Sequence, residues 1–177
     1  VNSASADLIL GGNLYVLAGT LNVGNDLYNQ NNDIEYANSG FPEFKVAGNA
    51  TVNINGQIRR SINTQQGALI YTQQDNSTVL IRGKNNDVAT SQTYDRAKLE
   101  ILNPGSQFNM SGNSTLTIDR SGSPSGVFFD VYLQPSTHNV TGGTINIGTS
   151  STPASQTFIM NNNVPLWSLV INGSVNQ

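Results

Sequence analysis

The chain has 177 residues, of which 11% are charged, with a net charge of −3 and a pI near 4.8. Average globular domains carry roughly 25% charged residues, so a polarity that comes mainly from Asn, Ser, Thr and Gly is typical of an extracellular protein. The basic residues are too scattered to neutralise phosphates, which argues against nucleic acid as a partner. No apolar run reaches the roughly 18 residues of a membrane span, and without Cys no disulfide framework can form.

Short runs of alternating apolar and polar residues recur along the whole chain. Val, Ile, Leu, Phe and Thr dominate these runs, and Gly or Asn flank them, as expected of short strands separated by tight turns. No window places apolar residues at helical spacing. We therefore predict an all-β fold. The predicted strands lie, in chain order, at residues 8–10, 14–16, 19–24, 44–46, 50–55, 58, 69–71, 77–83, 99–101, 108–110, 114–119, 131–133, 143–148, 158–160, 166 and 168–173.

One phrase recurs among these strands, and it reads small residue, Thr, apolar, polar, apolar, then Gly, Asn or Asp. Residues 19–24 (GTLNVG) and 143–148 (GTINIG) are its clearest copies. Successive copies lie 24–37 residues apart, an interval typical of one turn of a coil with connections of variable length. The first apolar residues of the six copies are Leu21, Val52, Val79, Leu116, Ile145 and Leu169.

Two further strand series run between the copies of this phrase. We assign residues 8–10, 44–46, 69–71, 99–101, 131–133 and 158–160 to a second series. A weaker third series comprises residues 14–16, 58, 108–110 and 166. Strands this short cannot bury an apolar face alone, but stacked turns of a coil bury a continuous core.

These patterns predict a right-handed parallel β-helix, a β-solenoid of about six turns with loop insertions, spanning residues 1–177 as a single domain. Neither end looks like a solenoid cap, so we expect the chain to be part of a longer protein and to contact its neighbouring domains. A β-sandwich is the competing fold. Its best support is Asn55-Gly56, a hairpin signal between two apolar runs.

Three polar segments interrupt the repeat and are expected to leave the coil as loops: residues 25–43, 84–97 and 119–128. Loops on a rigid scaffold commonly carry binding sites. The loop aromatics Tyr28, Tyr36 and Tyr94 are therefore our candidate binding residues.

Calcium is a weaker possibility, since Asp26, Asp33 and Glu35 offer the oxygen ligands that Ca²⁺ prefers. Their spacing does not match a known calcium loop, so we expect no cofactor apart from a possible Ca²⁺ ion.

Residues capable of catalysis are sparse. His138 is the only histidine and no nucleophile motif accompanies it. We expect the acids to lie in loops or on the outer surface, because buried acids are costly, and we interpret Arg59-Arg60 as a solvated turn. Trp167 is assigned to the core or to a cap. The acids considered as a source of polysaccharide-cleaving carboxylates are Asp75, Asp87, Asp95, Glu100, Asp119 and Asp130.

Thr begins the recurring phrase in five of its six copies. These residues could form one outward column, and flat Thr-rich solenoid faces can order water, so an ice-binding solenoid is one alternative. A Thr-x-Thr array is present only at Thr115-Leu116-Thr117, so packing between turns explains the column equally well. The five residues are Thr20, Thr51, Thr78, Thr115 and Thr144.

The phrases at residues 8–24, 44–56, 99–119 and 140–148 resemble β-helical stretches of very large secreted surface proteins. Adhesins of gliding Bacteroidetes and autotransporter-like passengers are the families concerned. This resemblance implies an extracellular, cell-surface, non-enzymatic module: a stiff stalk that presents loops to surface glycans or abiotic surfaces. The alternative on the same fold is a carbohydrate-active or carbohydrate-binding β-helix domain.

Overall fold

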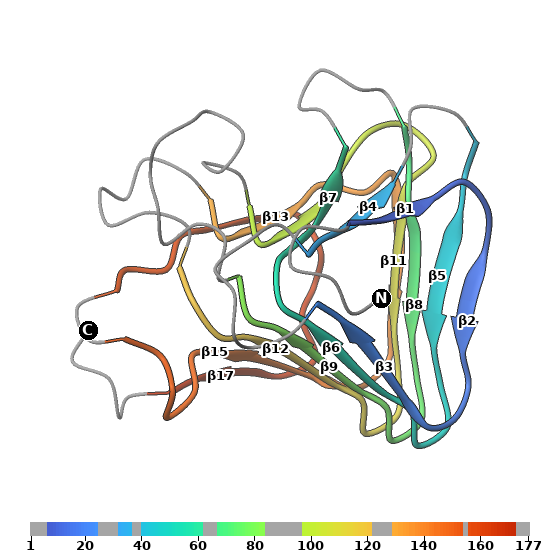
Figure 1. The fold of residues 1–177 in the computed structure, drawn as a ribbon. Helices are drawn as coiled ribbons and strands as arrows, with labels where there is room; N and C mark the ends of the chain where they lie inside the picture. The colour runs from blue at the N-terminus through green and yellow to red at the C-terminus, as the bar shows by residue number, and fades with distance from the viewer. Residues whose placement is uncertain are drawn as a thin grey trace.

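The computed structural model describes residues 7–24, 32–36, 40–61, 67–83, 97–121, 129–153 and 156–172. These residues form short strands and turns without a helix, and every strand pairing among them is parallel. The strands build three sheets, which form the three sides of a coil when the molecule is seen roughly down its axis (Figure 1). The fold is thus a parallel β-solenoid, as the sequence predicts. The right-handed sense of the coil stays a prediction.

Sheet A is the first side of the coil, and each of its strands comes from a different turn. Its strands are β1 (Leu8–Leu10), β4 (Ile34–Tyr36), β7 (Ile58–Arg60), β10 (Leu99–Ile101), β13 (Val131–Leu133) and β16 (Met160–Asn162).

Sheet B is the second side, on the right of Figure 1, with one strand from each of five turns. Its strands are β2 (Leu14–Val16), β5 (Glu43–Val46), β8 (Ile70–Gln73), β11 (Gln107–Met110) and β14 (Thr137–Val140).

Sheet C is the third side and contains the recurring phrase. The first apolar residues of the six copies pair in register from Leu21 to Leu169, which confirms the predicted repeat. Connections between successive turns differ in length, yet the register does not slip. The strands are β3 (Thr20–Val23), β6 (Thr51–Ile54), β9 (Thr78–Ile81), β12 (Thr115–Ile118), β15 (Thr144–Ile147) and β17 (Leu169–Ile171).

The competing β-sandwich is excluded by these pairings. The predicted hairpin at Asn55-Gly56 instead connects β6 of sheet C to β7 of sheet A. The turn is tight, because a Cβ on Gly56 would lie 1.8 Å from Oδ1 of Asp33 in the preceding turn. Asn-Gly therefore forms a corner of the coil rather than the end of a two-stranded ribbon.

The second and third strand series of the sequence analysis were wrongly sorted. Residues 44–46 belong to sheet B, whereas residues 99–101, placed in the same series, belong to sheet A. Residue 58 belongs to sheet A and residues 14–16 to sheet B, although both were placed in the third series. Strands of both sheets share the same alternation, so alternation alone could not separate them.

The core is made of inward-facing side chains that stack from turn to turn. In sheet B the column runs Phe44, Tyr71 and Phe108, all fully buried. Tyr71 contacts Phe44 edge to face, with ring centroids 5.9 Å apart, and stacks on Phe108 at 5.4 Å. Buried aromatic contacts of this kind add stability beyond the area they bury, so this column anchors sheet B to the core.

Corners of the coil require backbone conformations that few residues adopt. Asp75 has a φ of +64° and Asn103 a φ of +81°, in the left-handed region that Asn and Asp tolerate best. Gly112 has a φ of +70°, and a Cβ there would lie 2.7 Å from the carbonyl oxygen of Asp75. The corners of successive turns are therefore packed backbone against backbone.

Candidate functional site

The outer side of sheet A holds buried charges that sequence reasoning missed. Arg59 in β7 lies opposite Glu35 in β4. Its Nε is 2.7 Å from Oδ2 of Asp33, and its Nη2 is 2.5 Å from Oε1 of Glu35. Burial by itself lowers the pKa of Arg59, but the charges of Asp33 and Glu35 outweigh it and raise that pKa above its usual value. Arg59 therefore ties the second turn to the third by ionic contacts.

A second ionic contact continues along the same sheet. Nε of Arg60 lies 2.6 Å from Oε1 of Glu100, whose side chain is 4% exposed. The hydroxyl of Tyr36 donates to the backbone carbonyl of Glu100 at 3.0 Å. The two arginines and their partners thus connect β4, β7 and β10 with charge-assisted bonds, which are stronger than neutral ones.

Three of the acids expected in loops or on the outer surface are buried: Glu100 lies in strand β10, whereas Asp119 and Asp130 lie in the turns beside β12 and β13, as expected. Each is bonded within the fold. Asp119 accepts hydrogen bonds from the hydroxyls of Thr149 and Thr152, and Asp130 accepts one from the backbone N–H of Ile159 at 2.6 Å. These partners offset the cost of burial.

The remaining acids considered for catalysis do not join this group. Asp75 is exposed at a corner, and Asp87 and Asp95 lie outside the described residues. The interpretation of Arg59-Arg60 as a solvated turn was also wrong, since both belong to strand β7 and form ion pairs.

The candidate binding tyrosines are only partly covered by the structure. Tyr28 and Tyr94 lie outside the described residues. Tyr36, expected in a loop, instead ends core strand β4 and is fully buried. A residue with 0% exposure cannot offer its ring to a ligand, so Tyr36 acts as a packing residue of sheet A.

The calcium candidates have other partners in this fold. Asp26 lies outside the described residues, and Asp33 and Glu35 are paired with Arg59. Within the described ranges, no group of three or more His, Asp or Glu side chains gathers as a metal would require.

Two further aromatic or titratable residues lie at the surface. Trp167 is 69% exposed, so its assignment to the core was wrong, and its assignment to a cap stays a prediction. His138 lies exposed on β14, the last strand of sheet B in the described part of the chain. His138 pairs in register with Phe108 of β11. It is exposed because, among the described residues, no further strand of sheet B covers β14.

The outer face of sheet C presents uncharged polar columns. The threonines of the recurring phrase pair in register from Thr20 to Thr144. The neighbouring outward column holds Asn22, Asn53, Leu80, Thr117 and Asn146 instead of a second row of threonines. Asn53 donates to Asn22 across turns at 2.9 Å. The face is thus a ladder of hydroxyl and amide groups interrupted by Leu80, and the Thr-x-Thr array that would favour ordered water occurs only at Thr115 and Thr117.

A shallow groove of about 490 Å³ lies at the C-terminal end of this face. We call it the sheet C groove. Its lining combines hydroxyls and amides with two aliphatic side chains, and none of its lining residues is charged. Asp119 fixes the turn that follows β15 and forms one side of the groove, because its carboxylate accepts hydrogen bonds from the hydroxyls of Thr149 and Thr152 in that turn. The lining residues are Thr117, Asn146, Gly148, Thr149, Ser150, Val170, Ile171 and Asn172.

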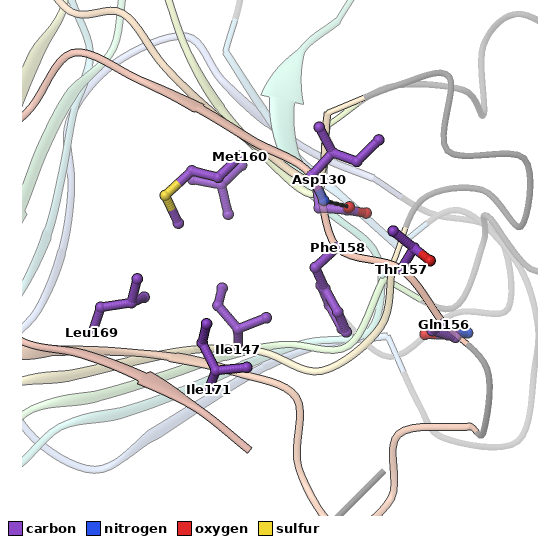
Figure 2. Close-up of a pocket in the computed structure, with 10 residues that line it drawn as sticks. Asp130, Ile147, Gln156, Thr157, Phe158, Met160, Leu169 and Ile171 are labelled. Atoms are coloured by element: carbon purple, nitrogen blue, oxygen red, sulfur yellow. Dashed lines mark hydrogen bonds between the residues drawn. The ribbon is translucent and has the colours of Figure 1, made fainter. Parts of the chain in front are cut away.

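An apolar cavity of about 310 Å³ opens at the same end, between sheets A and C. Leu169, Ile147 and Ile171 extend from sheet C toward Met160 and Phe158 on the opposite side (Figure 2). Thr157 and Gln156 lie at its rim. The cavity is lined by residues of the last two turns that the structure describes.

The comparisons with known proteins place the chain in no family. No family model, no curated protein and no solved structure matches it. Among the described residues, no helix is long and apolar enough to cross a membrane.

Proposed function

We propose that this chain is a rigid, non-enzymatic spacer of an extracellular surface protein. The in-register stacking of three parallel sheets carries this proposal. The first five turns are bonded to one another on three sides and the sixth to the fifth on two, so bending the coil would break backbone hydrogen bonds and open the core. A stalk that holds other parts of a protein away from a cell surface needs this stiffness.

The chemistry of the acids supports a non-enzymatic role. Glycoside cleavage needs two carboxyl groups that converge on a groove and can exchange protons or attack the substrate. Asp33, Glu35 and Glu100 are instead paired with arginines, and Asp119 and Asp130 accept hydrogen bonds from the fold. Carboxylates held in this way stabilise the coil.

Stiffness can be measured with spin labels, since the chain has no native Cys. Asn22→Cys and Asn146→Cys place two labels in one outward column, four turns apart, or about 19 Å at about 4.8 Å per turn. A stiff coil gives one narrow distance distribution by pulsed electron paramagnetic resonance, with unlabelled protein added to suppress intermolecular signals. A broad distribution would contradict the proposal, as would release of reducing ends from a polysaccharide panel.

Binding of a neutral glycan in the sheet C groove is the second candidate function. Its support is the uncharged lining of hydroxyls and amides beside Val170 and Ile171, since sugars combine hydroxyl groups with apolar ring faces. A glycan array with and without Ca²⁺ tests it. Asn146→Ala should weaken binding, whereas Asn53→Ala, in the same column but outside the groove, should not. No binding, or equal loss in both variants, would contradict this candidate.

A further inference from the structure

Side chains on sheet A link turns two to four of the coil, in addition to the backbone bonds between these turns. Arg59 of turn three forms ion pairs with two acids of turn two, and Arg60 forms one with Glu100 of turn four. The hydroxyl of Tyr36 in turn two donates to the carbonyl of Glu100, so this bond passes over turn three. Ion pairs and a bond that spans two interfaces therefore act on the same three turns.

The aromatic column of sheet B is confined to the same turns. Phe44, Tyr71 and Phe108 belong to turns two, three and four, and their rings are in contact. The same column holds Leu14 in turn one and His138 in turn five. The ring contacts of this column therefore begin at turn two and end at turn four.

A ladder of amides at the corner between sheets B and C has the same limits. Asn76 donates to Asn49 of the preceding turn at 3.3 Å, and Asn113 donates to Asn76 at 3.1 Å. Each asparagine stands two positions before a threonine of the sheet C column. The equivalent positions in turns one and five are Ala18 and Gly142, which carry no amide side chain.

Three columns at different places around the coil thus change their chemistry at the same two interfaces. We call the strands β4 to β12, which make up turns two to four, the central block. Among the described residues, neither the interface before the block nor the one after it contains an ion pair or a ring contact. Asp7 accepts a backbone N–H across the first of them, and Asp119 accepts two hydroxyls across the second.

We propose that the central block is a mechanical clamp, which stays wound under a tension that separates the turns on either side of it. Strands of neighbouring turns are bonded along the coil axis, and each turn contacts only its neighbours. Tension along the axis therefore acts on the interfaces in series, and the weakest opens first. Charge-assisted bonds are stronger than neutral ones, and contacts between aromatic rings add stability beyond the area they bury. The interfaces within the block consequently open last.

The clamp concerns unwinding rather than bending, so it can fail while the spacer function holds. Optical tweezers test it with DNA handles on two cysteines, Thr20→Cys in turn one and Thr144→Cys in turn five. Both positions lie in one outward column of sheet C, so the load runs along the axis and both ends of the chain stay outside it. The flanking turns should open first and release about 140 Å of contour length, at about 3.5 Å per residue. The block should open last, at a higher force, and release about 300 Å.

A matched pair of variants in this two-cysteine chain assigns the last step to the block. Arg60→Met removes the ion pair between turns three and four and should lower the opening force of the block toward that of the flanking turns. Lys45→Met replaces a cation of the block that forms no ion pair in the described part of the chain, and should leave both steps unchanged.

Circular dichroism first checks that both variants fold. If Arg60→Met does not, the lengths and order of the two steps in the two-cysteine chain decide alone. A single step of about 430 Å, or a last step much shorter than about 300 Å, would overturn the proposal. Equal effects of Arg60→Met and Lys45→Met on the last step would overturn it as well.

Discussion

Arg59 donates from Nε to the carboxylate of Asp33 at 2.7 Å, across 26 positions of sequence and one turn of the coil. The same carboxylate accepts the backbone N–H of Gln57 at 2.8 Å. A corner of the coil and a strand of the next turn are therefore held by one buried acid. Removing either member of such a pair leaves an uncompensated buried charge.

Arg59→Met is expected to lower the free energy of unfolding by about 3–5 kcal/mol, because Asp33 and Glu35 lose their counter-charge. Chemical denaturation measures this. Lys45→Met, a half-buried cation on the outer side of sheet B, is the control and should change stability by less than about 0.5 kcal/mol. Adding Asp33→Asn and Glu35→Gln to Arg59→Met should restore part of the loss. Equal effects of Arg59→Met and Lys45→Met would show that the pair is not stabilising.

Alkaline pH is expected to destabilise the fold through Tyr71. Burial raises the pKa of this tyrosine far above its usual value of 10.0. The contribution of the buried, neutral Tyr71 to the free energy of unfolding is thus fully present below pH 10. It is lost as the pH rises toward the pKa of the folded state, because unfolding then releases the proton of the hydroxyl. One such proton corresponds to about 1.4 kcal/mol per pH unit.

The matching variant is Tyr71→Phe. Above pH 10, the free energy of unfolding of this variant should fall less steeply with pH than that of the wild type, by the slope that corresponds to one proton. It should also cost about 1–2 kcal/mol at neutral pH, because Oε1 of Gln73 loses the hydroxyl that donates to it at 2.8 Å. Denaturant titrations between pH 7 and 11 distinguish the two effects. Identical slopes in the variant and the wild type would assign the alkaline loss to other groups.

Gly112→Ala should destabilise the coil by about 2–4 kcal/mol, since the residue has positive φ and its Cβ would press on the backbone of Asp75. Gly11→Ala is the matched substitution, because Gly11 has no atom within 4 Å of an added Cβ. We expect it to change the melting temperature little. Similar losses at both positions would show that close packing of the corner does not determine the cost.

Asp119→Ala should weaken the wall of the sheet C groove. The carboxylate accepts from Thr149 and Thr152, so its loss leaves the Thr149 hydroxyl without that acceptor, at a cost of about 1–3 kcal/mol, whereas Thr152 keeps the backbone carbonyl of residue 119. Ser151→Ala, exposed in the same turn, serves as the control. Hydrogen exchange of residues 148–153 should accelerate in Asp119→Ala and stay unchanged in Ser151→Ala. Unchanged exchange in both would mean that the backbone alone holds the turn.

Much of the fold was predictable, because the copies of the recurring phrase can be aligned with one another and this alignment gives the register of sheet C. Five of the six copies begin with a small residue and Thr, and all end at a Gly, Asn or Asp, so Leu21 and Ile145 could be aligned without a structure. The division between sheets A and B was not predictable. Residues 44–46 and 99–101 show the same apolar–charged–apolar alternation, and the side on which a strand lies depends on how many residues the preceding corner uses.

The charged contacts were missed for a related reason. Arg59 looks like a surface residue when its own segment is considered, because its partners come from a different turn. A signal was nevertheless present: Arg59 and Arg60 follow Ile58 in a strand-like run, and acids occur in the runs at residues 33–35 and 99–101. Placing these runs on one sheet would have aligned opposite charges. The sheet C groove gave no such signal, since it depends on how the turn after β15 folds back.

The register of sheet C stays constant while the connections between its strands vary in length, and this has an evolutionary consequence. Thr51 pairs with Thr78, and Thr78 with Thr115. A chain that lost residues 78–114 would lose one strand from each sheet and could still bring Thr115 opposite Thr51. Whole turns can therefore be gained or lost by duplication and deletion without a shift of register in sheet C. The length of such a molecule can change in increments of one turn, about 4.8 Å each.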